Sequence, residues 1–205
     1  MWSMTHVAVD LNEADLLARM RNFEDHLVDR KTAKDAKDWK KTAVAFANSV
    51  PVRLPAVLYI GVRDNGEIET PQPDLDEIQK RLNQRMQRVY PRVFYVPKII
   101  RGENGLQALA VIIPGSELRP HFAGLSYVRR GSESIEASEE QFAELIRAAE
   151  QQGGSNPCLE GEEHYCYQSH SYSNYRRILL RKPVAEQHGG HRLQSVLCDA
   201  SGRHP

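Results

Sequence analysis

The chain has 205 residues, 40% of them hydrophobic, which is enough for one good-sized domain with a buried core and an appendage. Its 27 basic and 27 acidic residues cancel, so net charge offers no argument for a nucleic-acid or membrane partner, and any basic surface must be local. No segment approaches the roughly 18 apolar residues of a membrane span, and no signal peptide opens the chain, so we expect a cytoplasmic protein without a membrane partner.

The first half of the chain alternates helical and strand patterns. Residues 11–22 predict a short amphipathic helix capped by Asn12, and residues 26–31 predict a short strand. The clearest helical pattern covers 35–49, where apolar residues recur at helical spacing. The nearly continuous apolar run 56–62 follows it and is typical of a central strand covered on both faces.

The second half continues the same mixture. It predicts, in order, a turn at 64–66 with a short returning strand, a helix over 74–89, a hairpin of 92–100 with 106–114, a strand over 125–135 and a helix over 138–151. This order predicts an α+β fold with a mixed, largely antiparallel sheet packed by helices. We expect residues 1–150 to form one domain and residues 151–205 an irregular or partly disordered tail.

Acidic residues stand at the ends of predicted strands. Asp29 and Lys31 share one face of the first strand, and Asp64 follows the central strand in an Asp-Asn-Gly turn. Carboxylates at such places can hold Mg²⁺ or Mn²⁺, which prefer hard oxygen ligands, and a lysine can stabilise charge on a phosphate. The simpler interpretation is an ordinary turn aspartate beside a solvated strand face.

Basic residues recur on two predicted helices and one strand. They are Lys34, Lys37 and Lys41, then Arg85 and Arg88, then Arg129 and Arg130 beside Tyr127. Such residues could contact phosphates without reading sequence, and a tyrosine beside paired arginines could stack a base. The alternative is solvated helix faces with Tyr127 packed in the core. Asn48, near the end of a predicted helix, is expected to cap it.

Three landmarks in this order resemble the Schlafen/AlbA-type domain. The first is Glu24 followed by the acid-x-Lys run 29–31. The second is the AFANS segment 45–49 with the strand and turn 59–66. The third is the YVRRGS segment 127–132. Together they span residues 20–150, most of the chain.

The resemblance implies an α+β domain that faces nucleic acid, and some members of this family are metal-dependent ribonucleases that use three acids. Carried over by position, those acids are Glu24, Asp29 and Asp64, with Lys31 beside them and Mg²⁺ or Mn²⁺ as the metal. The chain departs from the family pattern at Asp29, where glutamate is usual, and in the longer segment 50–55.

The leading hypothesis is therefore a nucleic-acid-binding domain for DNA or RNA, acting through local basic patches. One alternative is a divalent-metal nuclease that uses the three carboxylates, and another is a structural or homo-oligomerisation module. The P-loop motif of NTP-hydrolysing proteins, the dinucleotide-binding motif and the serine-hydrolase motif are absent from the sequence.

Overall fold

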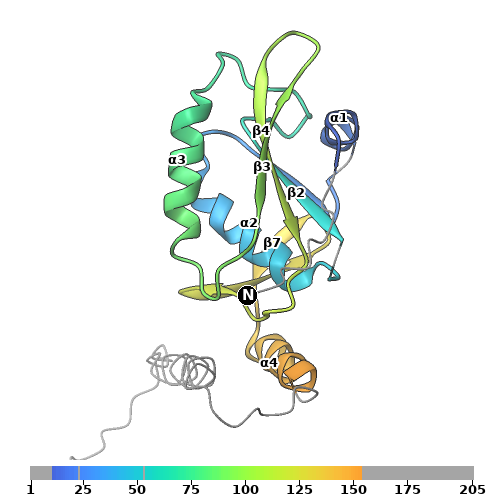
Figure 1. Ribbon diagram of the computed structural model, residues 1–205, viewed down its shortest axis with the longest axis vertical. Helices are drawn as coiled ribbons and strands as arrows, with labels where there is room; N and C mark the ends of the chain where they lie inside the picture. Colours follow the sequence, from blue (N-terminus) through green and yellow to red (C-terminus); the bar gives the residue numbers. More distant parts are fainter. Residues whose placement is uncertain (1–10, 23, 53, 154–205) are drawn as a thin grey trace, which may run out of the picture. The chain divides into compact units, whose positions relative to one another are not determined.

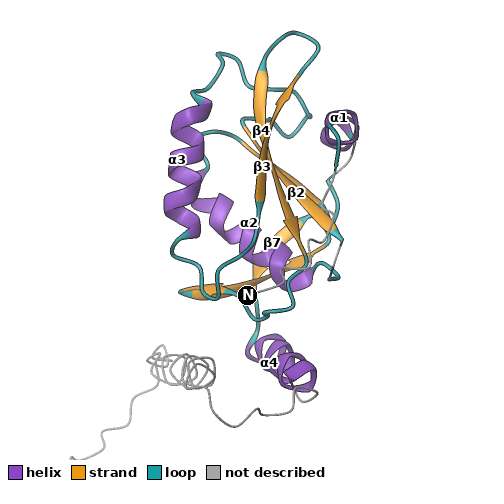
Figure 2. Cartoon of the chain, in the orientation of Figure 1, coloured by secondary structure: helices purple, strands orange, loops and turns teal. Residues whose placement is uncertain are grey.

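A computed structural model describes residues 11–22, 24–52 and 54–153, without the side chains of 150–153. The helices are α1 (Glu13–Arg21), α2 (Ala36–Ser49), α3 (Leu75–Met86) and α4 (Glu139–Gly153). The strands are β1 (Val28–Lys31), β2 (Pro55–Ile60), β3 (Val96–Arg101), β4 (Gln107–Pro114), β5 (Phe122–Ala123), β6 (Leu125–Arg130) and β7 (Glu133–Glu136) (Figures 1 and 2). Beyond the end of α4, the predicted tail lies outside the described residues.

The strands form a four-stranded sheet in the order β1-β2-β4-β3 and a three-stranded sheet in the order β5-β6-β7. β1 and β2 are parallel and are joined by α2, because parallel neighbours need a crossover connection. All other pairs are antiparallel. The predicted α+β class with a mixed, largely antiparallel sheet is confirmed.

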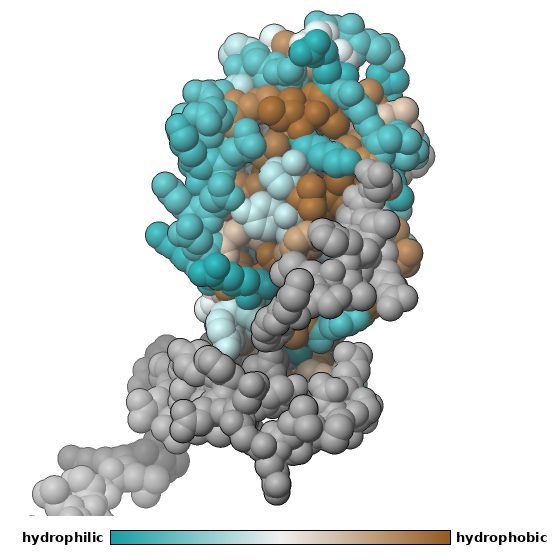
Figure 3. Space-filling view, viewed as in Figure 1, coloured by the Kyte–Doolittle hydropathy of each residue, from teal (hydrophilic) through white to brown (hydrophobic). Residues whose placement is uncertain are grey.

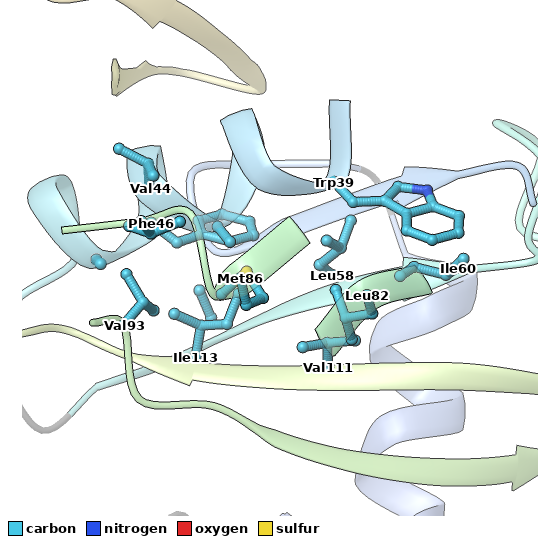
Figure 4. Close-up of a cluster of buried hydrophobic side chains, with 14 of the residues drawn as sticks. Trp39, Val44, Phe46, Leu58, Ile60, Leu82, Met86, Val93, Val111 and Ile113 are labelled. Atoms are coloured by element: carbon cyan, nitrogen blue, oxygen red, sulfur yellow. The ribbon is translucent and has the colours of Figure 1, made fainter. Parts of the chain in front are cut away.

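Helices cover both faces of the larger sheet, with α1 and α3 on opposite sides (Figure 1). Ala56, Leu58 and Ile60 of β2 pack under α2 and α3, in the cluster drawn in Figure 4. Val57 and Tyr59 pack on the other face, with the apolar side of α1. The prediction that this run forms a central strand buried on both faces is therefore confirmed.

The residues predicted to begin α1 and α4 form N-terminal caps. The side chain of Asn12 accepts a hydrogen bond from the Asp15 N–H at 2.9 Å, so the predicted cap of α1 is confirmed. At the start of α4, Ser138 and Gln141 exchange side-chain-to-backbone hydrogen bonds in a capping box.

Two predicted strands differ from the structure. The run 125–135 divides into β6 and β7 at a turn where Gly131 has a φ of 59°. The strand expected after the 64–66 turn is reduced to one bridge, between Val62 and Ile68. Gly66 has a φ of 82°, and a Cβ atom there would lie 2.9 Å from the Met20 carbonyl oxygen, so this tight turn requires glycine. No helix in the described residues is long and apolar enough to cross a membrane.

Candidate functional site

Side-chain alternation along β1 sends neighbouring charged residues to opposite faces of the larger sheet. Asp29 pairs in register with Leu58, which faces α2, whereas Arg30 pairs with Tyr59, which faces α1. Asp29 and Arg30 are both buried. One strand therefore places a buried carboxylate on one side and a buried guanidinium on the other.

Asp29 lies beneath α2, where both of its carboxylate oxygens accept hydrogen bonds. One carboxylate oxygen accepts from Lys31 Nζ at 2.6 Å. The other accepts from Thr42 Oγ1 at 3.0 Å and from Arg129 Nη1 at 2.8 Å. The side chains of Asp29 and Arg129 are only 3% and 1% exposed, so this is a buried ion pair.

Glu24 and Asp64 lie with Arg30 on the α1 side. Glu24 Oε1 accepts the Arg30 backbone N–H at 2.7 Å and lies 3.9 Å from the guanidinium. That guanidinium also donates to the carbonyls of Met20, Asn22 and Asp64, tying the end of α1 to the 64–66 turn. These residues border an open hollow of about 510 Å³, lined by Arg21, Asn22, Glu24, Arg30, Asp64 and Asn65.

The structure therefore does not bring the three predicted metal ligands together. Asp29 faces α2, while Glu24 and Asp64 border the hollow on the α1 side. Among the described residues, no group of three or more histidine, cysteine, aspartate or glutamate side chains is placed to hold a metal ion. The residues present do not fit a shared Mg²⁺ or Mn²⁺ centre, and Lys31, expected beside it, is paired with Asp29 instead.

A cluster of three cations lies where α2 and α3 pack together, and we call Lys40, Arg85 and Arg88 the α2–α3 basic cluster. Partial burial, then the charges of Arg85 and Arg88, lower the pKa of Lys40 below its ordinary value. The Lys40 ammonium donates to the Ala123 carbonyl of β5 at 3.2 Å. In the described part of the chain none of the three has a carboxylate within salt-bridge distance. The outer side of α3 is hydrophilic (Figure 3).

The three lysines predicted from the sequence are Lys34, just before α2, and Lys37 and Lys41 on α2. Lys34 and Lys37 are exposed, and Lys41 Nζ lies 5.8 Å from the centre of the Tyr127 ring. Tyr127 is half-buried, and burial, together with the nearby acids Glu136 and Asp38, raises the pKa of its phenol. The structure therefore brings Lys41 to Tyr127, with acidic neighbours beside them.

The two arginines predicted beside Tyr127 lie on opposite faces of β6. Arg129 shares the α2-facing side of β6 with Tyr127 but is buried, with its guanidinium 4.7 Å from the centre of the Phe46 ring. Arg130 is exposed and points to the opposite face, because side chains alternate along a strand. Arg129 is thus a buried structural residue, and the expected clamp of Tyr127 with both arginines does not form.

The structural roles of two buried polar residues, Arg30 and Asn48, were not predicted from the sequence. Arg30 lies on the same face of β1 as the buried Val28, toward α1. A charged residue on an otherwise apolar strand face is the sequence signal that could have indicated a buried cation. Asn48 does not cap α2 as predicted; its amide reaches His121, Ser126 and Tyr127, all far along the chain. Nothing local in the sequence marks those contacts.

Comparison with known proteins gives one family match. A family model described as "Schlafen, AlbA_2" matches residues 24–138, more than half of the chain. No curated protein matches.

Two solved structures are similar to this chain. One is the DIP2311 protein of Corynebacterium diphtheriae, at 15% identity and a TM-score of 0.45, covering 67% of this chain and 31% of that one. The other is the N-terminal domain of a Nitrosomonas europaea protein named as related to the ATP-dependent DNA helicase RecG. It has 22% identity and a TM-score of 0.44, covering 63% of this chain and 95% of that domain. This chain thus spans less than a third of the DIP2311 protein.

Proposed function

The chain belongs to the Schlafen, AlbA_2 family, and from this premise we propose that it is a nucleic-acid-binding domain that contacts phosphates through the α2–α3 basic cluster. The observation that carries the proposal is the partly buried Lys40, whose pKa is lowered first by burial and then by the nearby charges of Arg85 and Arg88. Like charges held together without a carboxylate partner repel one another, and a bound phosphate would relieve that repulsion.

We expect further residues predicted from the sequence to contribute to this interface. Lys34 precedes α2, Lys37 and Lys41 lie on it, and Tyr127 offers an aromatic ring beside Lys41. Phosphate contacts of this kind supply affinity without sequence preference, and an aromatic ring can stack a base. DNA and RNA, single-stranded or double-stranded, are all candidate ligands. The cytoplasmic location and self-association expected from the sequence stay predictions.

The test is binding of fluorescently labelled single- and double-stranded DNA and RNA, followed by anisotropy. The variant Lys40→Gln/Arg85→Gln/Arg88→Gln removes the cluster. Lys80→Gln is the matched control, because Lys80 is an exposed cation on the same helix that is already paired with Asp76 at 2.5 Å. We expect the triple variant to bind much more weakly and the control to bind like the wild type.

The alternatives predict other outcomes in the same experiment. A wild-type protein that binds none of these nucleic acids would favour a structural or oligomerisation module. Unchanged binding by the triple variant would place the interface elsewhere, and equal loss in the triple variant and the Lys80 control would show that binding does not depend on the cluster in particular. No contact in the described structure favours the nuclease, because the three carboxylates do not share a site.

A further inference from the structure

Asp29 stands at the position where the family resemblance implies a metal ligand, and its surroundings indicate a different role. We infer that Asp29 is one half of a buried ion-pair lock with Arg129, which fastens the smaller sheet to the larger one. It follows that this chain does not build a three-carboxylate metal centre around Asp29. The inference rests on the contacts of these two side chains and is independent of the proposed nucleic-acid interface.

The Asp29 carboxylate has neither room nor free charge for a divalent cation. Both of its oxygens already accept hydrogen bonds, from Lys31, Thr42 and Arg129. Two cationic groups within 2.8 Å therefore already occupy the places that a cation would take. Mg²⁺ also keeps several bound waters, and a side chain that is 3% exposed leaves no space for them.

Arg129 connects three parts of the fold from its position on β6. Its guanidinium donates to Asp29 of β1 and to Ser134 Oγ of β7 at 2.9 Å. It also donates to the Asp25 carbonyl at 2.8 Å, and it lies over the Phe46 ring of α2. One side chain of the smaller sheet thus binds the edge strand of the larger sheet and the helix between them.

Of the two remaining acids of the implied set, Glu24 is also engaged in structure, whereas Asp64 is exposed and contributes its backbone carbonyl to Arg30. Glu24 accepts a hydrogen bond from the Arg30 backbone N–H, which points away from β2 at the edge of the sheet. The Arg30 side chain lines the same hollow as Glu24 and Asp64. A cation entering there would meet the positive charge of Arg30 as well as the two carboxylates. The separation of Asp29 from this pair therefore leaves the hollow without a third acid.

The test combines thermal unfolding with Mn²⁺ titration of the full chain. The variants are Asp29→Asn, Arg129→Gln, the double variant carrying both, and Asp64→Asn as an exposed carboxylate control. Asp29→Asn leaves the buried Arg129 charge without its carboxylate, and Arg129→Gln leaves Asp29 with only the partly exposed Lys31 as a cationic partner. Each single variant at the lock should therefore lose roughly 10 °C in Tm. The double variant should lose clearly less than the sum of the two, and Asp64→Asn should stay close to wild type.

Mn²⁺ separates the lock from a metal ligand. We expect Mn²⁺ to shift the Tm of the wild type and of Asp29→Asn by the same amount. If Asp29→Asn does not fold, the neutral double variant replaces it in this comparison. The inference is overturned if Asp29→Asn is as stable as the wild type, if the two lock substitutions are additive, or if Mn²⁺ stabilises the wild type and not the variant.

Discussion

Asn48 illustrates how a single buried amide holds two parts of this fold together. Its Nδ2 donates to the carbonyls of His121 and Tyr127 and to Ser126 Oγ, at 2.9 to 3.1 Å. Its Oδ1 accepts the His121 backbone N–H at 2.7 Å. The side chain therefore fixes the last turn of α2 against β6 and the segment that precedes β5.

Replacing this amide should be costly. Asn48→Leu keeps the approximate volume but leaves a buried N–H and several buried acceptors without a partner, so we expect a loss of about 3 kcal/mol in the free energy of unfolding. Chemical denaturation of the variant measures this loss. Gln84→Ala, at an exposed position of α3, is the control and should change stability by less than about 0.5 kcal/mol. Equal stabilities of the two variants would contradict the role of Asn48.

His121 makes the stability of the domain depend on pH. Its ring is fully buried, Nδ1 lies 2.7 Å from the Pro91 carbonyl, and burial followed by the charge of Arg119 lowers its pKa below 6.5. In the pH range between this lowered pKa and 6.5, we therefore expect the folded state to hold His121 neutral while the unfolded chain binds a proton. Its contribution to stability is present above pH 6.5 and is lost as the pH falls through the lowered folded pKa.

The free energy of unfolding of the wild type should consequently fall as the pH drops below 6.5, by up to about 1.4 kcal/mol per pH unit from this group. The variant His121→Gln should be less stable at pH 7.5 and should lose that part of the pH dependence. Urea denaturation at several pH values measures both curves. Parallel curves for the two proteins between pH 5 and 7 would contradict the assignment to His121.

At the scale of elements, β3 is an open edge that is protected against pairing with another chain. The Arg101 N–H points away from β4 and donates to Glu13 Oε1 of α1 at 2.9 Å. Because residues of an antiparallel strand alternate between its two sides, Ile99 and Pro97 also face this edge. Proline has no N–H to offer there, so Ile99 presents the one open N–H among these three residues.

Pro97→Thr should therefore promote self-association through β3. The substitution restores an N–H at the edge without removing a hydrogen bond to β4, and it places a good strand former beside the exposed Ile99. Size-exclusion chromatography with light scattering should detect dimers or larger species that the wild type lacks at the same concentration. Pro97→Lys is the control and should stay like the wild type, because a charged edge residue also opposes pairing. Identical profiles for all three proteins would contradict the role of Pro97.

The sequence predicted the elements of this fold better than the contacts between them. The apolar stripe of α2, the doubly buried strand β2 and the Asn12 cap depend on neighbouring residues, so their patterns are visible locally. The sequence also predicted that Asp29 and Lys31 share one face of β1, because side chains alternate along a strand, and the two side chains do pair. The sequence did not indicate that Asp29 pairs with Arg129, because the two residues are 100 positions apart in the chain.

At the scale of the whole molecule, a formal net charge of zero conceals a local basic surface. Lysines of α2 and arginines of α3 recur with helical spacing in the sequence, but only the packing of the two helices brings Lys40 to Arg85 and Arg88. Packing also divides the acids that the family resemblance groups together, because β1 separates Asp29 from the Glu24 side of the sheet. The fold thus brings together the α2–α3 basic cluster and separates the three carboxylates of the implied metal site.

The most direct test of the central claim is the salt dependence of nucleic-acid binding. A plot of log affinity against log salt concentration has a slope of about −0.7 per phosphate contact for single strands. Removing the α2–α3 basic cluster with Lys40→Gln/Arg85→Gln/Arg88→Gln should make that slope shallower by about 2, while Lys80→Gln leaves it unchanged. A triple variant with the wild-type slope would contradict the claim that this cluster contacts phosphates.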